Sequence, residues 1–154
     1  PLRMIIVGAV HISQALVGIA KSAGFEVSVI DPRGSFATKT RFPDVTLIDE
    51  WPDDAVKTLK PDDRTALVTL THDPKLDDPA LEAALVSDCF YIGSLGSKKT
   101  HSARVERLLS NGFTDKQINR INAPIGLDIG AKSPSEIAVS ILAEVISAKY
   151  NKVL

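Results

Sequence analysis

The sequence of 154 residues predicts an α/β fold with a mostly parallel sheet in a single domain. Short apolar runs typical of buried strands alternate along the chain with segments of helical periodicity. Polar or glycine-rich turns follow these runs, and parallel strands bring such turns to one edge of a sheet. No repeat, low-complexity segment or linker interrupts the alternation. One sheet and one core are therefore expected.

The N-terminal part predicts a strand-helix-strand unit. Arg3 to Gly8 is a short buried strand, and His11 to Ala23 is a helix that Gly24 ends. Phe25 to Ile30 is the second strand. Parallel units of this kind cross over with a right-handed connection and pack the helix on the sheet.

The middle of the chain continues the alternation. Strands are predicted at Val45 to Ile48, Thr65 to Leu70 and Phe90 to Ile92. Helices are predicted between them at Asp53 to Leu59 and Pro79 to Ser87. This order is typical of a parallel sheet with crossover helices.

The last third of the chain is mainly helical. Helices are predicted near Thr100 to Asn111 and at Thr114 to Arg120, followed by a loop from Ala123 to Lys132. The final helix begins at Ser133, which combines an N-cap serine, a proline at the first helical position and a glutamate three residues after the cap. Its start is the sharpest boundary in the sequence.

Composition and charge exclude several classes of function. The net charge is -1, with 44% apolar and 24% charged residues, so neither nucleic acid nor an anionic membrane is an expected partner. Cys89 is the single cysteine, which rules out an internal disulfide, and the three histidines show no zinc spacing, so no metal site is predicted. A core position is predicted for Cys89 rather than a role as nucleophile. A small molecule or another protein is therefore the expected partner.

The ends of the chain bear on localisation. No apolar run approaches the ~20 residues that span a bilayer, and no secretory leader is visible, so a cytoplasmic protein is expected. The chain enters a strand directly after Pro1 and Leu2. We therefore expect it to be a piece of a longer protein.

Four polar or glycine-rich turns follow predicted strands and should converge on one edge of the sheet, where ligands of open parallel sheets bind. Such a concentration of Gly, His, Asp, Ser and Lys exceeds what turns alone need. The turns are Gly8-Ala9-Val10-His11, Asp31-Pro32-Arg33, Thr71-His72-Asp73 and Gly93-Ser94-Leu95-Gly96-Ser97-Lys98-Lys99.

The first turn lies where a dinucleotide loop of the form G-x-G-x-x-G would lie. Gly8 occupies the first glycine position, whereas Val10 and Ser13 occupy the second and third. Val10 places a branched side chain where a diphosphate would approach. The start of the following helix still offers N–H groups to an anion, so a ligand site and a plain structural turn both remain open.

Asp31 lies where an acidic residue accepts the ribose hydroxyls of a bound adenosine. Arg33 could instead meet a phosphate, so the pair does not decide between NAD-like and NADP-like ligands. The same residues also form good turn chemistry by themselves.

The remaining turns supply the candidates for chemistry. His72 beside Asp73 is the best candidate for proton transfer and thus for any catalytic role, although adjacent side chains often point apart. The turn from Gly93 to Lys99 resembles an anion loop but lacks the P-loop pattern. No arrangement of Ser, His and Asp suggests acyl transfer, so the residues alone specify no reaction.

Six separated motifs, taken in order, resemble the XdhC/CoxI family over essentially the whole chain. They are GAVHISQAL, DPR, RFP (Arg41 to Pro43), LTHDPKLDDPAL (Leu70 to Leu81), YIGSLGSKKT (Tyr91 to Thr100) and PIGLDIGAKSPSEIAVSILAE (Pro124 to Glu144). The part matched is the family's C-terminal Rossmann-like domain, which implies a three-layer α/β/α architecture. The family's N-terminal cysteine-containing domain is absent from residues 1–154.

The resemblance implies an accessory protein that binds, protects and inserts the molybdenum cofactor, a pterin with a possible dinucleotide form, into the apo-enzyme of a molybdenum hydroxylase. Many family members have Gly-Ala-Gly-His where this chain has Val10, which weakens the case for ordinary dinucleotide binding. The positions expected to bind the cofactor are Gly8, Ala9, Val10, His11, Asp31, Arg33, Thr71, His72, Asp73, Gly93, Ser94, Gly96, Ser97 and Asp128.

Three functions follow as hypotheses. The leading one is a maturation factor of xanthine dehydrogenase or CO dehydrogenase type that is not itself a catalyst and that meets a hydroxylase and a cysteine-desulfurase-type sulfur donor. The alternatives are an NAD(P)-dependent oxidoreductase and a nucleotide-sensing Rossmann module. A homodimer is also expected, because the last helix has more apolar surface than one sheet face covers, at Ile137, Ile141, Leu142, Val145 and Ile146.

Overall fold

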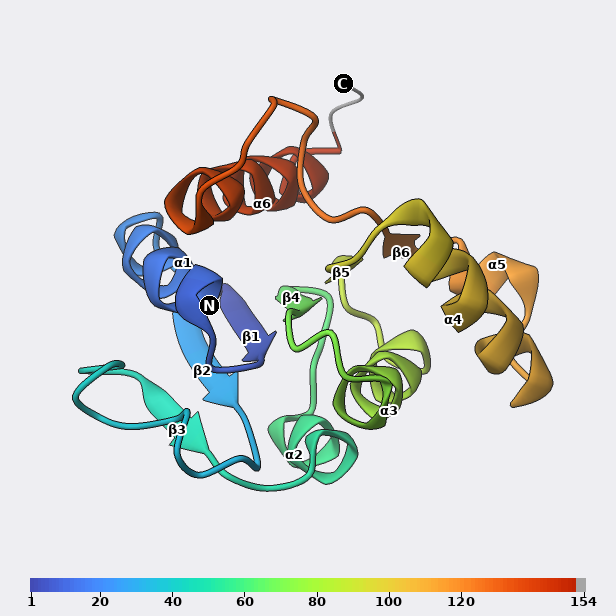
Figure 1. Ribbon diagram of the computed structural model, residues 1–154, viewed down its shortest axis with the longest axis horizontal. Helices are drawn as coiled ribbons and strands as arrows, with labels where there is room; N and C mark the ends of the chain where they lie inside the picture. Colours follow the sequence, from blue (N-terminus) through green and yellow to red (C-terminus); the bar gives the residue numbers. More distant parts are fainter. Residues whose placement is uncertain (152–154) are drawn as a thin grey trace.

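The computed structural model describes residues 1–151 and contains a six-stranded, entirely parallel sheet of order β3-β2-β1-β4-β5-β6 (Figure 1). The strand order reverses between β1 and β4, which is the switch point where ligands of such sheets bind. The strands are β1 Arg3–Val7, β2 Glu26–Ile30, β3 Thr46–Ile48, β4 Thr65–Thr69, β5 Tyr91–Ser94 and β6 Ile121–Asn122.

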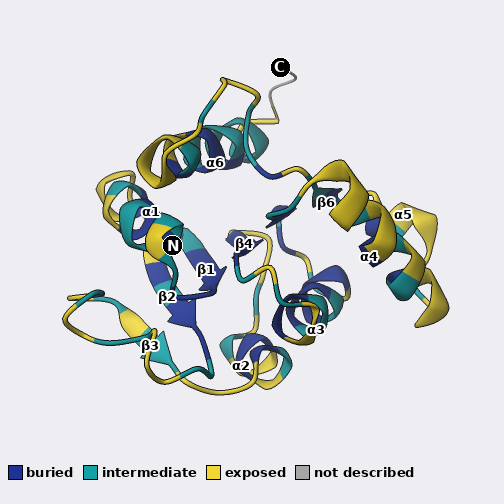
Figure 2. Cartoon of the chain, viewed as in Figure 1, coloured by how far each residue is buried: buried dark blue, intermediate teal, exposed yellow. Residues whose placement is uncertain are grey.

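Helices cover both faces of the sheet, so the predicted three-layer α/β/α architecture is confirmed. One core cluster joins the sheet to α1 and α6, and a second joins the opposite face to α2, α3, α4 and α5. Figure 2 shows buried residues on the strands and on the sides of the helices that face them. The helices are α1 His11–Ser22, α2 Pro52–Leu59, α3 Pro74–Leu85, α4 Lys98–Ser110, α5 Asp115–Ile118 and α6 Pro134–Lys149.

The start of α3 was predicted wrongly. The helix begins at Pro74, five residues before the predicted Pro79, and Asp73 caps it by accepting a hydrogen bond of 3.0 Å from the backbone of Lys75. Two Asp-Pro pairs follow each other in this segment, and both have the chemistry of a helix start. Pro79 lies inside the helix, where the buried Leu76, Ala80 and Leu81 outweigh one missing backbone bond.

The region around β5 also differs from the prediction. β5 extends to Ser94, so Gly93 and Ser94 lie in the sheet rather than in the turn, paired with Val68 and Thr69 of β4. Helix α4 begins at Lys98 instead of Thr100. The two-residue strand β6 was missed because so short a segment carries no periodicity.

The predicted start of α6 is confirmed. The side chain of Ser133 accepts a hydrogen bond from Glu136 N, and the Glu136 carboxylate accepts one of 3.0 Å from Ser133 N. Within α6, Ile141 and Val145 are fully buried in the cluster that also contains α1. Much of the apolar surface that suggested a dimer is therefore covered within the chain.

The other global expectations concern Cys89 and the membrane. Cys89 is buried beside β5 as predicted, and burial raises the pKa of its thiol. None of the helices in residues 1–151 combines the length and hydropathy that crossing a bilayer requires. Within the same residues, no group of three or more His, Cys, Asp and Glu side chains is arranged to hold a metal ion.

Candidate functional site

The turn after β1 is pressed against the turn after β4. Gly8 has a φ of +116°, and a Cβ at this position would lie 2.9 Å from Thr71 Cγ2 and 3.3 Å from Thr71 N. Both the backbone conformation and the close approach require glycine. The structure thus brings the first and third predicted turns together at the switch point.

Val10 and Ser13, which depart from the dinucleotide fingerprint, both make contacts that hold the start of α1 in place. Val10 is the N-cap of α1 with extended backbone, and its side chain packs partly against the core. The Ser13 hydroxyl is fully buried, donates to the Gly8 carbonyl and accepts a bond of 3.3 Å from Val10 N. His11, in contrast, is exposed, and its side chain makes no hydrogen bond or ion pair with the rest of residues 1–151.

The carboxylate of Asp31 is fully buried and already accepts four hydrogen bonds. Its Oδ1 accepts from Arg33 N and Nε at 2.9 Å each, and its Oδ2 accepts from Arg33 Nη2 at 2.8 Å and Ala9 N at 2.9 Å. Burial alone would raise the pKa of Asp31, but the hydrogen bonds from Arg33 and Ala9 outweigh it and hold the pKa below its usual value. Neither oxygen is left open for a ribose.

Arg41, which was not predicted as a site residue, closes the loop after β2 over the first turn. Its Nη1 donates to the carbonyls of Ala9 at 2.9 Å and Phe36 at 2.7 Å, and its Nη2 donates to Gln14 Oε1 at 2.9 Å. The Arg33 guanidinium lies 4.4 Å from the centre of the Phe36 ring. The sequence signal for Arg41 was its place in the RFP motif, one of the six motifs that occur in the family's order.

The turn after β4 is organised by Asp77, a second residue that sequence reasoning missed. Asp77 is 1% exposed, and its carboxylate accepts from Thr71 Oγ1 at 2.6 Å, His72 N at 3.2 Å and Thr71 N at 3.4 Å. Burial raises the pKa of Asp77 to about 6 against the lowering effect of these bonds. Asp77 therefore holds the His72 backbone at its positive φ of +65°.

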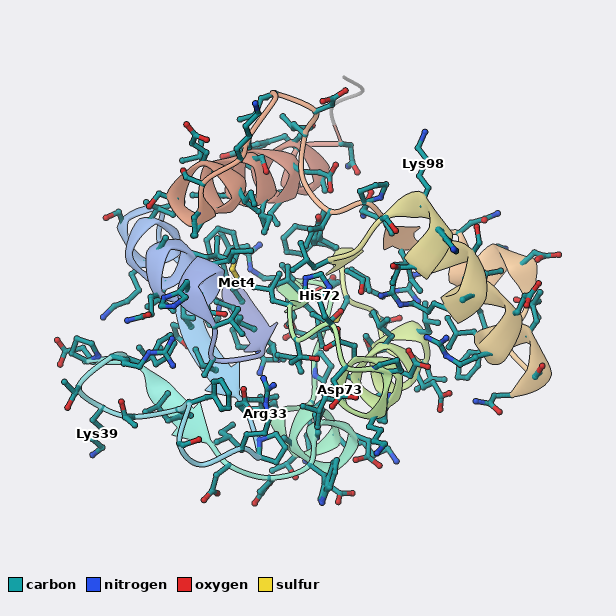
Figure 3. All side chains as sticks on the ribbon, in the orientation of Figure 1. Met4, Arg33, Lys39, His72, Asp73 and Lys98 are labelled. Atoms are coloured by element: carbon teal, nitrogen blue, oxygen red, sulfur yellow. The ribbon has the colours of Figure 1, made fainter. Side chains whose placement is uncertain are left out.

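The predicted proton-transfer pair does not form a hydrogen bond. The Asp73 side chain is engaged at the start of α3, and His72 is exposed and makes only the backbone contact to Asp77. In Figure 3, Arg33, His72 and Asp73 lie in the central part of the view, whereas Lys98 lies apart at the start of α4. The catalytic role of His72 and Asp73 remains a prediction.

The residues of β5 serve the interior. The hydroxyls of Ser94 and Thr69 share a hydrogen bond of 2.7 Å and are fully buried. A Cβ at Gly93 would lie 2.6 Å from Tyr91 Oη and 2.7 Å from Ile125 Cδ1. Gly93 thus lets the segment after β6 pack onto β5.

Gly96 and Ser97 lie in the β5–α4 turn, and Asp128 lies on a loop after β6. Ser97 caps α4 through a bond of 3.1 Å from Thr100 N, and Gly96 has a φ of +136°. Asp128 lies on the loop 124–131, which lines a solvent-open cavity of 490 Å³ together with the β5–α4 turn and the start of α6. We call this space the loop cavity, and the turns after β1, β2 and β4 the rim.

A buried arginine supports the β5–α4 turn. Arg104 of α4 is 3% exposed, donates to the Leu95 carbonyl at 3.2 Å and lies 3.1 Å from His101 Nδ1. Burial lowers the pKa of Arg104, and the carboxylates of Asp77 and Asp78 oppose that effect. Arg104 was not predicted because helical spacing alone does not reveal a buried charge.

Comparison with known proteins then decides the family. The model of the XdhC Rossmann domain matches residues 4–145. The chain belongs to the XdhC Rossmann-domain family.

Curated relatives of this XdhC-family chain agree with that assignment. A protein of Bacillus subtilis described as a probable subunit of xanthine dehydrogenase is 33% identical over 96% of the chain and 43% of the relative. The molybdenum cofactor insertion chaperone PaoD of Escherichia coli is 29% identical over 98% of the chain and 41% of the relative. The chain spans less than half the length of these relatives.

Solved structures confirm the fold. A crystal structure described as a xanthine dehydrogenase from Bacillus halodurans superposes with a TM-score of 0.83 and 33% identity, over 99% of this XdhC-family chain and 44% of that chain. The Lmo0794 protein of Listeria monocytogenes superposes with a TM-score of 0.60 at 15% identity, over 94% and 92% of the two chains. The second similarity concerns the fold alone.

Proposed function

We propose that this chain is the Rossmann part of an accessory protein that binds the molybdenum cofactor as cargo and assists its maturation and insertion into a molybdenum hydroxylase of xanthine dehydrogenase or CO dehydrogenase type. The observation that carries the proposal is the similarity to the cofactor insertion chaperone PaoD over 98% of the chain. The xanthine dehydrogenase relative of Bacillus subtilis supports the same class of partner.

The rim fits a phosphate-bearing cargo. Helix α1 begins directly after the Gly8 turn, and the free N–H groups at the start of a helix favour an anion. The first turn of α1 contains no acidic residue. The exposed His11 and His72 lie on the two turns that Gly8 and Thr71 bring together. A carrier has to bind its cargo reversibly. Exposed polar side chains such as these can bind it without a covalent step.

The alternative, an NAD(P)-dependent oxidoreductase, has weaker support. The Asp31 carboxylate is occupied by Ala9 and Arg33, so the ribose acceptor of a standard dinucleotide site is not available. His72, the candidate proton donor, has no side-chain partner among the described residues that would fix its tautomer.

Partners and location follow as finer parts of the proposal. An apo-hydroxylase is the recipient, and a cysteine-desulfurase-type donor supplies sulfur to the bound cargo. The lone buried Cys89 supports a reducing compartment, which favours the cytoplasm. The exposed apolar side chains that still favour a homodimer are Val139 of α6 and Ile129 of the neighbouring loop.

An anaerobic transfer experiment tests the proposal. Cofactor released from a molybdenum hydroxylase is mixed with the chain, the mixture is separated by size exclusion, and molybdenum is measured in the protein fraction. We expect molybdenum to elute with the chain and the loaded fraction to restore activity to an apo-hydroxylase. Binding of NADH with hydride transfer to a carbonyl, and no molybdenum with the chain, would contradict the proposal.

A further inference from the structure

Two buried side chains of opposite charge support two of the turns at the carboxyl edge of the sheet. Asp77 of α3 supports the turn after β4, and Arg104 of α4 supports the β5–α4 turn. Asp77 is 1% exposed and Arg104 is 3% exposed, so both charges lie away from water. A buried charge is costly unless hydrogen bonds or an opposite charge compensate it. The partners of these two side chains therefore decide how firmly each turn is held.

The Asp77 carboxylate uses both of its oxygens to hold the turn after β4. Its Oδ1 accepts from Thr71 Oγ1 at 2.6 Å and from Thr71 N at 3.4 Å, and its Oδ2 accepts from His72 N at 3.2 Å. His72 has a φ of +65°, which a residue other than glycine keeps only with support from its surroundings. A protonated carboxyl accepts fewer bonds, because one of its oxygens becomes a donor. The charge on Asp77 therefore bears directly on the shape of this turn.

The hydrogen bonds of the Arg104 guanidinium are incomplete. Its Nη2 donates to the Leu95 carbonyl at 3.2 Å, and its Nη1 lies 3.1 Å from His101 Nδ1. Its Nε is buried without a hydrogen-bond partner among the described residues, and the nearest carboxylate oxygen in an ion pair with it, Asp78 Oδ1, lies 4.0 Å away. Asp78 also accepts a hydrogen bond of 2.6 Å from Arg107 Nε. Asp78 alone therefore compensates the charge of Arg104 only in part.

Asp77 supplies the remaining negative charge at longer range. No hydrogen bond or ion pair joins Asp77 to Arg104 in the part of the chain that the structure describes, but each charge acts on the other. Burial lowers the pKa of Arg104, and Asp77 opposes that effect more strongly than Asp78 does. Burial raises the pKa of Asp77 to about 6, and Arg104 is among the groups that oppose the rise. The two buried charges thus stabilise each other.

We propose that Asp77 and Arg104 form a proton-controlled pair that couples the turn after β4 to the β5–α4 turn. While Asp77 is ionised, it holds Thr71 and His72 and compensates Arg104, which holds the Leu95 carbonyl. When a proton from the solvent binds to the Asp77 carboxylate, its bonds to the first turn weaken and Arg104 loses its stronger counter-charge. Protonation also removes the burial cost of the carboxylate, so the chain stays folded while both turns loosen together.

Other charged and titratable groups surround this pair. Those that face it are Arg33 on the turn after β2, His72 on the turn after β4, Asp73 and Asp78 on α3, and His101 and Arg107 on α4. On α2, Asp53 and Lys57 lie beside Pro79 and Glu82, farther along α3. Histidine side chains ordinarily change charge between pH 5 and 8, so the test has to separate His72 and His101 from Asp77.

Nuclear magnetic resonance of the isotope-labelled 154-residue chain tests the coupling between about pH 4 and about pH 8. The carboxyl carbon of Asp77 reports its charge, and the backbone amides of His72 and Leu95 report the two turns. We expect the three signals to share a transition at a pH of about 6. Asp77→Asn should remove this transition from both amides, and any titration that remains belongs to the histidines. A Leu95 transition that is unchanged in Asp77→Asn would overturn the inference.

Variants of α4 test the part played by Arg104. Arg104→Gln should raise the midpoint of Asp77 by about 1 pH unit and remove the transition from Leu95, because it deletes the charge that links them. Arg104→Lys keeps the charge and should leave the midpoint of Asp77 close to its original value. Lys99→Gln is the matched control, since it removes a positive charge from an exposed position of the same helix and should leave the midpoint unchanged.

An unchanged Asp77 midpoint in Arg104→Gln would contradict the coupling. If Arg104→Gln fails to fold, the Leu95 transition in Asp77→Asn decides the question by itself. The inference concerns the chain's own residues, so its outcomes are distinct from those of the proposed function. A chain that carries molybdenum but shows no coupled transition retains the carrier function and loses the coupling. A coupled transition without molybdenum binding gives the opposite result.

Discussion

The rim and the loop cavity lie in the same domain but differ in whether their charged side chains have hydrogen-bond partners. On the rim, Asp31 and Asp77 are buried, and their carboxylates accept hydrogen bonds from the turns themselves. In the loop cavity, the side chains of Lys98 and Asp128 have no partner within residues 1–151. Charges of the first kind hold the backbone in place, whereas charges of the second kind remain available for recognition.

The largest expected effect concerns the contact between the two rim turns. Gly8→Ala should lower the free energy of unfolding by about 3 kcal/mol, because the new Cβ combines an unfavourable φ with crowding against Thr71. The matched change Gly130→Ala in the cavity loop has a positive φ but no atom within 4 Å, so about 1 kcal/mol is expected. Chemical denaturation measures both. Equal losses would mean that the rim is no more tightly packed than the cavity loop.

The next effect concerns the carboxylates. Asp31→Ala should cost about 2 to 3 kcal/mol of unfolding free energy, since it leaves Ala9 N without its acceptor and the Arg33 guanidinium without its counter-charge. Asp128→Ala should change stability by less than about 0.5 kcal/mol, as for an exposed residue without partners. Thermal unfolding of the two variants gives the comparison, and a large loss in Asp128→Ala would show that the cavity charge is structural.

The third effect depends on pH. The Asp77 carboxyl ionises with a pKa of about 6 in the folded chain and near 3.8 when unfolded, so the folded state holds the extra proton between these values. The free energy of unfolding should therefore fall as pH rises from 4 to 6, by on the order of 2 kcal/mol, and this contribution should be constant above that window. Asp77→Asn cannot titrate and serves as the reference. Parallel pH profiles for the two proteins would refute the shifted pKa.

The smallest expected effect tests the fingerprint itself. Val10→Gly should cost about 1 kcal/mol of stability through lost packing and added backbone freedom. It should produce no gain in NADH affinity, because Asp31 stays occupied. Adding Arg33→Ala to this variant removes the two side-chain hydrogen bonds to the Asp31 carboxylate and should introduce measurable NADH binding by calorimetry. A gain from Val10→Gly alone would show that bulk at this position excludes the dinucleotide.

The sequence predicted the sheet and most of its elements because their signals are local. Alternating apolar runs and helical periods located β1, α1 and β2, and the capping residues located the start of α6 at Ser133. The start of α3 was misplaced because Asp73-Pro74 and Asp78-Pro79 carry the same local signal, and burial of Leu76 decides between them. Tertiary packing supplies that information.

The site was predicted as one set of turns, whereas the structure divides it. Gly8, Asp31 and Thr71 come together as expected, but Asp128 lies at the loop cavity, which is bounded by the β5–α4 turn. The buried Asp77 and Arg104 escaped prediction, since their roles depend on partners that only the fold brings into contact. Buried residues that hold a site in place, such as Asp77 and Arg104, are therefore harder to predict from the sequence than residues that form turns.

The hydrogen bonds that Glu144 accepts from Tyr91 and Gly126 also set an order of events during synthesis. The ribosome releases residues 124–131 before it releases the helix that contains Glu144, so the loop that encloses the cavity must wait for its anchor. Until α6 has docked, the nascent chain can form much of its sheet without the walls of the cavity. The walls of this cavity are therefore complete only in a chain in which α6 has already been translated.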